Sequence, residues 1–76
     1  MQQMSTCRRR ARFEEVVEVV DLTGKQQLLP TATCEVEEHH AFVALQFGSD
    51  DQRPVRISHL QFNSLMVTRQ VVYVSW

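Results

Sequence analysis

Hydrophobic and polar residues alternate over two neighbouring segments in the middle of the chain, and this pattern predicts a β-hairpin. In residues 31–37 the small or apolar side chains occupy every second position, at Ala32, Cys34 and Val36. The same period of two runs through residues 41–47. Because His39 and His40 separate the two segments, we expect both histidines at the turn.

Residues 13–22 carry a pattern that fits two structures. Phe13, Val16, Val17 and Val20 lie at helical spacing. The valine content favours a strand, because β-branched side chains lose rotamer freedom in a helix. We therefore expect a strand that turns at residues 22–25, with a short N-terminal helix as the alternative.

The second half of the chain predicts further short strands. Residues 48–52 are a loop by composition, and residues 55–60 follow as a strand that Pro54 places at an edge. After a short irregular stretch, residues 65–76 predict a final long or broken strand. The predicted fold class is mainly β, with four or five antiparallel strands arranged as a small barrel or a curled sheet.

The charges divide the chain into two parts. A chain of 76 residues has room for one domain, and half of its eight basic residues crowd into one short stretch, as Arg8, Arg9, Arg10 and Arg12. We therefore predict a basic, flexible N-terminal arm at residues 1–12 and a single small β domain at residues 13–76. From Phe13 onward, the remaining four basic residues stand against all nine acidic ones, so the domain is acidic.

The predicted strands follow one another in a recognisable order. A turn at Leu22-Thr23-Gly24-Lys25 is followed by strands through Cys34 and Leu45, the pair Arg56-Ile57 and the pair Val71-Val72. This succession resembles that of Sm-like small β-barrels, and its spacing is similar to that of the Rho-binding antiterminator family. The resemblance covers roughly residues 16–74. It implies a barrel fold and a binding role without catalysis.

Residue types that bind metals or catalyse reactions do not converge in the predicted strands. A zinc site would draw on Cys34, His39, His40 and His59, but neighbouring strand residues face opposite sides of a sheet. Ser58 and His59 diverge for the same reason, and two glycines are too few for a phosphate loop. We predict no metal, no cofactor and no enzymatic activity.

Acidic residues fall on segments that we expect to be neighbours in the sheet. Together with Asp21 they predict a negative, protein-binding face made of Glu14, Glu15, Glu18, Glu35, Glu37 and Glu38. Such a surface can occupy the basic groove of a nucleic-acid-handling protein, with Phe62, Tyr73 or Trp76 as aromatic anchors. Our first hypothesis is a small regulatory protein that inhibits a larger protein partner by covering its surface.

Arginine recognises phosphate through bidentate contacts, which supports an alternative hypothesis. In this alternative the protein is an RNA- or DNA-binding module that uses Arg8, Arg9, Arg10 and Arg12, helped by Arg53 and Arg56.

The apolar final segment, residues 71–76, predicts self-association, because small domains without disulfides or metals often rely on oligomers. We expect a homodimer. Cys7 and Cys34 occupy different environments, and we interpret both as free thiols. Since the sequence shows neither a secretory signal nor an apolar run long enough to span a bilayer, we predict a cytoplasmic protein.

Overall fold

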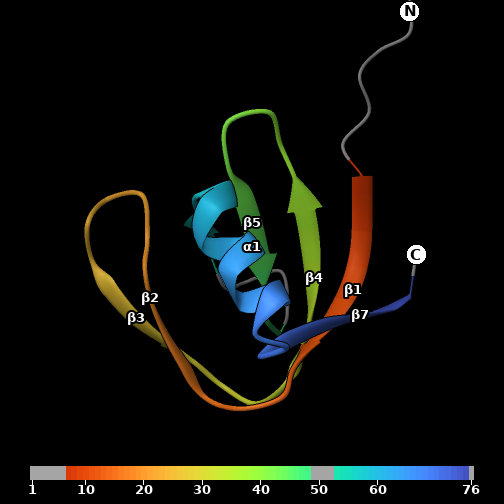
Figure 1. Cartoon of the computed structure of the whole chain (residues 1–76). Coiled ribbons are helices and arrows are strands. Elements are labelled where there is room, and N and C mark those ends of the chain that lie inside the picture. Colours follow the sequence, from red (N-terminus) through yellow and green to blue (C-terminus); the bar gives the residue numbers. More distant parts are fainter. Residues whose placement is uncertain (1–6, 49–52, 76) are drawn as a thin grey trace, which may run out of the picture.

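Strands dominate the described part of the chain, and one helix interrupts them near its end (Figure 1). The structure is a computed structural model, and it describes residues 7–48 and 53–75. In chain order its elements are β1 Cys7–Phe13, β2 Val17–Val20, β3 Gln26–Leu29, β4 Thr33–Glu38, β5 Val43–Gln46, β6 Val55–Ile57, α1 His59–Val67 and β7 Val71–Ser75.

The strands form one large and one small antiparallel sheet. The large sheet has five strands in the order β6-β5-β4-β1-β7, and β2 pairs with β3 in the small one. This confirms the prediction of a mainly β, antiparallel protein. Within the described ranges the large sheet does not close into a barrel, because β6 and β7 lie at opposite edges and do not pair.

Both turns expected from the sequence are present. Between β4 and β5 the backbone N–H of His39 donates to the carbonyl of Phe42 at 2.8 Å, so His39 and His40 lie at the turn as predicted. Between β2 and β3 the N–H of Gly24 donates to the carbonyl of Asp21 at 2.9 Å. Gly24 has a φ of 88°, which a residue without a Cβ atom adopts at no steric cost.

The first four strands are the two arms of one long hairpin that bends near its middle. β1 pairs with β4, and β2 pairs with β3 further along the same two arms. The register slips by one residue between the two halves, since Arg12 faces Thr33 whereas Val17 faces Leu29. The arm that contains β1 and β2 therefore has one extra residue between these pairs. An extra residue in one strand bends a strand pair. As Figure 1 shows, the β2–β3 half turns away from the large sheet and faces it from the far side of α1.

The predicted N-terminal arm is corrected by this arrangement. The residues Arg8, Arg9, Arg10 and Arg12 belong to β1, which has β4 on one side and β7 on the other. The physical reason is that Ala11 and Phe13, both 0% exposed, bury the inner face of this strand and hold it in the sheet. Residues 1–6 of the predicted arm lie outside the described residues.

The alternative of an N-terminal helix over residues 13–22 is wrong, and the strand prediction holds for part of that range. Phe13 ends β1, and residues 17–20 form β2 with alternating burial. Val17 and Val19 face the core, while Glu18 and Val20 face solvent. The helical spacing of the apolar residues therefore spans two separate strands.

A helix occupies residues for which the sequence pattern predicted strand and irregular structure. The strand expected at 55–60 ends at Ile57, and α1 then runs from His59 to Val67. Ser58 starts the helix, because its Oγ accepts a hydrogen bond from the N–H of Gln61 at 3.1 Å. The final strand is confirmed over residues 71–75. The described chain contains no helix with the length and apolar character that crossing a membrane requires.

The helix ends at a residue in the left-handed conformation that is not glycine. Arg69 has a φ of 63°, and its N–H donates to the carbonyl of Met66 at 3.1 Å. The N–H of Gln70 reaches the carbonyl of Leu65 at 2.9 Å. These two bonds help to satisfy the last carbonyls of the helix, and they direct the chain into β7.

One hydrophobic core unites both sheets and the helix. Phe13, Leu45 and Ile57 of the large sheet are fully buried, and α1 contributes Phe62 and Leu65 to the same cluster. Phe62 is only 3% exposed, so it cannot serve as the surface anchor suggested by the sequence.

A single side chain links the helix to the backbone of the small sheet. The side-chain oxygen of Gln61 accepts a hydrogen bond from the N–H of Val20 at 3.0 Å. Its side-chain nitrogen donates to the carbonyl of the same residue at 2.8 Å. The amide thus pairs with β2 as a neighbouring strand would, and it fixes the bent half of the hairpin against α1.

We predict that Gln61→Ala lowers the free energy of unfolding by about 1 kcal/mol, because both bonds to Val20 disappear while water compensates in part. Urea denaturation measures the loss. Asn63→Ala, at an exposed position of the same helix, is the control and should not destabilise the protein. Equal stabilities of the two variants would contradict this role of Gln61.

Candidate functional site

The outer face of the large sheet carries a ladder of opposite charges. Along β1, Arg8 and Arg10 point to this face, and across β4 they meet Glu37 and Glu35 in register. Cross-strand pairs of opposite charge stabilise a sheet, typically by about 0.2–1 kcal/mol. The basic and the acidic residues that the sequence analysis assigned to separate regions therefore interleave on one surface.

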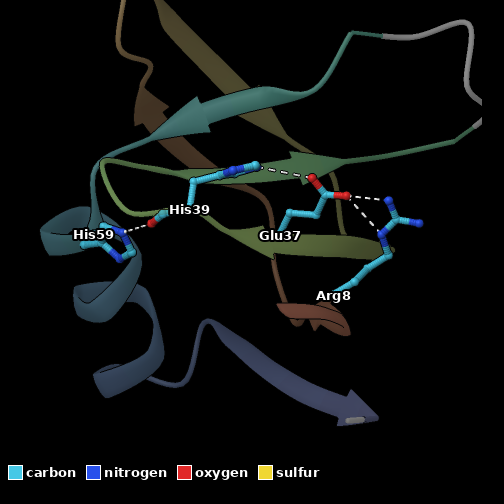
Figure 2. A network of polar contacts seen from close by, with 4 residues as sticks. All are labelled: Arg8, Glu37, His39 and His59. Carbon is cyan, nitrogen blue, oxygen red and sulfur yellow. Dashed lines mark hydrogen bonds and ion pairs between the residues drawn. The ribbon is translucent and has the colours of Figure 1, made fainter. Parts of the chain in front are cut away.

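Glu37 is the centre of the polar network in Figure 2. The Nε atom of Arg8 donates to Oε2 of Glu37 at 2.9 Å, and Nη2 of Arg8 contacts the same oxygen. On the other side Nε2 of His39 lies 3.2 Å from Oε1 of Glu37. The hydrogen bonds from Arg8 are the main cause that lowers the pKa of the Glu37 carboxyl below its ordinary value.

The network extends to the start of the helix through a backbone atom. Nε2 of His59 lies 2.7 Å from the carbonyl oxygen of His39. A dashed line marks this hydrogen bond in Figure 2. A hydrogen bond of this length fixes the β4–β5 turn against α1. The network thus connects β1, the turn and the helix, and we interpret it as a structural connection.

The predicted acidic face is divided among several places. Glu35 and Glu37 share the outer face with arginines, and Glu14 forms an ion pair with Arg12 at 3.0 Å. Glu38 points to the opposite side of β4, where it accepts a hydrogen bond from the Tyr73 hydroxyl at 2.6 Å.

Glu15 lies in the bend of the hairpin and Glu18 on the outer side of β2, both exposed. The expected single negative face is thus corrected, because the same strand alternation that aligns Glu35 with Glu37 turns Glu38 away.

The arginines of the nucleic-acid hypothesis also separate into two groups. Arg8 and Arg12 contact carboxylates, and the guanidinium of Arg9 lies 4.8 Å from the centre of the Tyr73 ring. Arg53 and Arg56, in contrast, lie together at the other edge of the large sheet and line a hollow with a volume of about 780 Å³. The sequence pattern did not predict that these arginines lie at two separate places.

The hollow has a third cation that the sequence analysis did not select. Lys25 follows the β2–β3 turn, and it lines the hollow together with Arg53 and Arg56. The backbone N–H of Leu22 donates to the carbonyl of Arg56 at 2.9 Å, which joins the turn to β6. The sequence signal was weak, because a lysine after a glycine turn is common on any surface. We call this hollow the basic cleft, defined by Lys25, Arg53 and Arg56.

Histidine and cysteine side chains do not assemble a reactive centre in the described ranges. Cys34 is buried, His40 is exposed at the turn, and His39 and His59 take part in the polar network. Across residues 7–48 and 53–75 no group of three or more His, Cys, Asp or Glu side chains has the geometry to hold a metal ion. Burial, reinforced by the charge of Glu35, raises the pKa of the Cys34 thiol to about 12.

Comparison of the chain with protein-family models, with curated proteins and with solved structures gave no match. The resemblance to Sm-like barrels and to the Rho-binding antiterminator family therefore stays a prediction.

We predict that Glu37→Gln destabilises the protein at pH 7 by about 0.5 kcal/mol, the value expected for a partly exposed ion pair. Because the pKa of Glu37 is lowered in the folded state, its contribution is complete above the ordinary value of 4.5 and disappears as the pH falls through the folded-state pKa. Unfolding curves between pH 7 and pH 2 measure this. Glu18→Gln is the control, and a constant gap between wild type and Glu37→Gln at every pH would contradict the assignment.

The buried thiol of Cys34 should react slowly in the folded protein. In a Cys7→Ser background, modification by a disulfide reagent at pH 8 should be roughly a hundredfold slower than in denaturant, because the thiolate is the reacting form. Absorbance of the released aromatic thiolate follows the reaction. Equal rates in the folded and unfolded states would show that Cys34 is accessible and ionised.

Proposed function

We propose that this chain is a non-enzymatic regulatory binding protein that occupies the surface of a larger protein partner through the edge strand β7. The supporting observation is the chemistry of that edge. β7 has β1 on one side, and among the described strands it has no neighbour on the other. Its residues, Val71–Ser75, include no charge and no proline, and Val74 is 41% exposed.

Proteins usually protect such an edge with charged side chains, proline or a bulge that turns the strand away. β7 has neither a charge nor a proline, although its pairing with β1 slips in register beside Val74. Its outer edge offers backbone N–H and C=O groups to an extended segment of another protein, which then adds a strand to the sheet. Backbone hydrogen bonds supply the affinity, and side chains such as Val74 supply the contacts that select the partner.

The acidic residues contribute in this proposal by selecting the partner rather than by forming one docking face. Glu15, Glu18 and Glu35 form no ion pair with the described basic residues. A partner that presents basic side chains beside its extended segment gains from these charges and associates faster. This retains the hypothesis that a nucleic-acid-handling protein is the target.

A second copy of the chain covers the same edge when the partner is absent. Two β7 strands that pair antiparallel across a two-fold axis would each satisfy the open edge of the other, which is the usual symmetry of a homodimer. In this proposal the partner competes with the dimer.

The inaccessible Cys34 thiol suits a protein of the reducing cytoplasm, where we place it.

We predict that Val74→Lys abolishes both associations, because a charge on the edge opposes pairing without touching the buried core. Light scattering should show a dimer for wild type at high micromolar concentration and a monomer for Val74→Lys. Leu28→Lys is the matched control, since Leu28 is 71% exposed on β3, away from this edge.

A second experiment tests binding of the protein partner. Wild-type, Val74→Lys and Leu28→Lys proteins are immobilised and incubated with lysate from the source cell. A partner that depends on β7 should be recovered with wild type and Leu28→Lys and reduced at least about tenfold with Val74→Lys, a loss of roughly 1.4 kcal/mol. Identical recovery with all three proteins would overturn the role of the edge.

A further inference from the structure

The basic cleft brings together three cations that come from separate parts of the chain. Lys25, Arg53 and Arg56 are three of the four basic residues that follow Phe13 in the sequence. No carboxylate in the described ranges lies within 4.0 Å of their charged groups, whereas Arg8 and Arg12 each have such a partner.

These three cations come from different parts of the chain and surround one hollow. Lys25 comes from the end of the β2–β3 turn, Arg53 from the segment before β6, and Arg56 from β6 itself. Each of them is exposed. Like charges around a hollow repel one another, and the repulsion is relieved when an anion enters.

Asp21 is the only acidic residue that lines the cleft in the described part of the chain, and its carboxylate is already used. Oδ1 accepts hydrogen bonds from the hydroxyl of Thr23 at 2.6 Å and from the N–H of Lys25 at 3.0 Å, while Oδ2 accepts one from the side chain of Gln27 at 2.8 Å. These bonds, that of Thr23 first, lower the pKa of Asp21 below its ordinary value. The carboxylate therefore shapes the turn, and the three cations outnumber it.

The cleft also has apolar surface beside the cations. Leu22, Pro54 and Val55 line it together with Phe42, and Leu22 is 52% exposed. The guanidinium of Arg56 lies 5.5 Å from the centre of the Phe42 ring, and the His39 ring stacks on Phe42 at 4.5 Å. Leu22, Pro54 and Val55 therefore supply the apolar surface that remains for a ligand. A volume of about 780 Å³ accommodates a molecule of the size of one nucleotide.

From this combination we infer that the basic cleft binds a nucleoside phosphate, with the phosphate between Lys25, Arg53 and Arg56 and the base against the apolar wall. The class of ligand follows from the lining, because a phosphate needs several cationic donors and a base needs a flat apolar contact. A free nucleotide and one unit of a single-stranded nucleic acid share this chemistry. The site is separate from the β7 edge, so it adds to the proposed protein-binding function and does not depend on it.

The location of this inferred site differs from the one that the nucleic-acid hypothesis assumed. That hypothesis relied mainly on Arg8, Arg9, Arg10 and Arg12, which the structure places in a paired strand. In the inference Arg53 and Arg56 keep their role, Lys25 joins them, and the β1 arginines remain part of the sheet.

The test follows amide signals of the isotope-labelled protein by NMR at low salt while three probes are added separately: inorganic phosphate, adenosine monophosphate and an eight-nucleotide single-stranded DNA. We expect both nucleotide probes to shift the amides of Leu22, Thr23 and Arg56, and inorganic phosphate to act more weakly. Tighter binding of the oligonucleotide identifies a strand as the source, and equal affinity identifies a free nucleotide.

Paired variants separate the cleft from general charge effects. Arg53→Gln with Arg56→Gln should weaken nucleotide binding at least about tenfold, which corresponds to the loss of charge-assisted contacts. Arg10→Gln with Arg69→Asn removes the same charge at exposed positions outside the cleft and should change binding less than twofold. All four positions are exposed, and far-ultraviolet circular dichroism checks that both variants stay folded.

Three results would overturn the inference. The first is the absence of any shift with millimolar adenosine monophosphate and with the oligonucleotide. The second is a set of shifts confined to residues outside the cleft. The third is equal loss of binding in the two double variants, which would show attraction by net charge alone. The first two results come from spectra of the wild-type protein, so both remain decisive even if a variant fails to fold.

Discussion

The bend in the long hairpin is the constraint on which the remaining structure depends. Because the register slips between Arg12–Thr33 and Val17–Leu29, the outer half of the hairpin cannot continue in the plane of the large sheet. It instead encloses α1 between two β layers, which gives a chain of this size one shared core. The amide of Gln61 completes the enclosure by pairing with the backbone of Val20.

Several parts of the fold could be predicted from the sequence because their signals are local. The alternation of Cys34 and Val36 with glutamates defined β4, and Gly24 defined the turn of the small sheet. The helix was missed because its apolar residues are not confined to one face: Phe62 and Leu65 are buried, whereas Leu60 and Val67 are exposed. The same residues fit a broken strand equally well. A signal was nevertheless present: Ser58 stands three residues before Gln61, the spacing of a capping box.

The roles of the charged residues were harder to predict, because the sequence gives their number but not their partners. Arg8 and Arg10 were interpreted as part of an arm, although the alternate residues at the end of that stretch, Ala11 and Phe13, suit the buried face of a strand. Only the register between β1 and β4 shows that these arginines face glutamates. The convergence of Lys25 with Arg53 is equally invisible in the sequence, since it depends on contact between a turn and an edge strand.

The position of β1 in the sheet also has a consequence for how the protein reaches its native state. Its two neighbours, β4 and β7, come from the middle and from the far end of the described chain. Contacts between distant segments close large loops, and such loops slow folding relative to helical proteins of equal length. The nascent chain must therefore leave one side of β1 uncovered until the final strand arrives, and during that interval chaperones or neighbouring molecules compete for it.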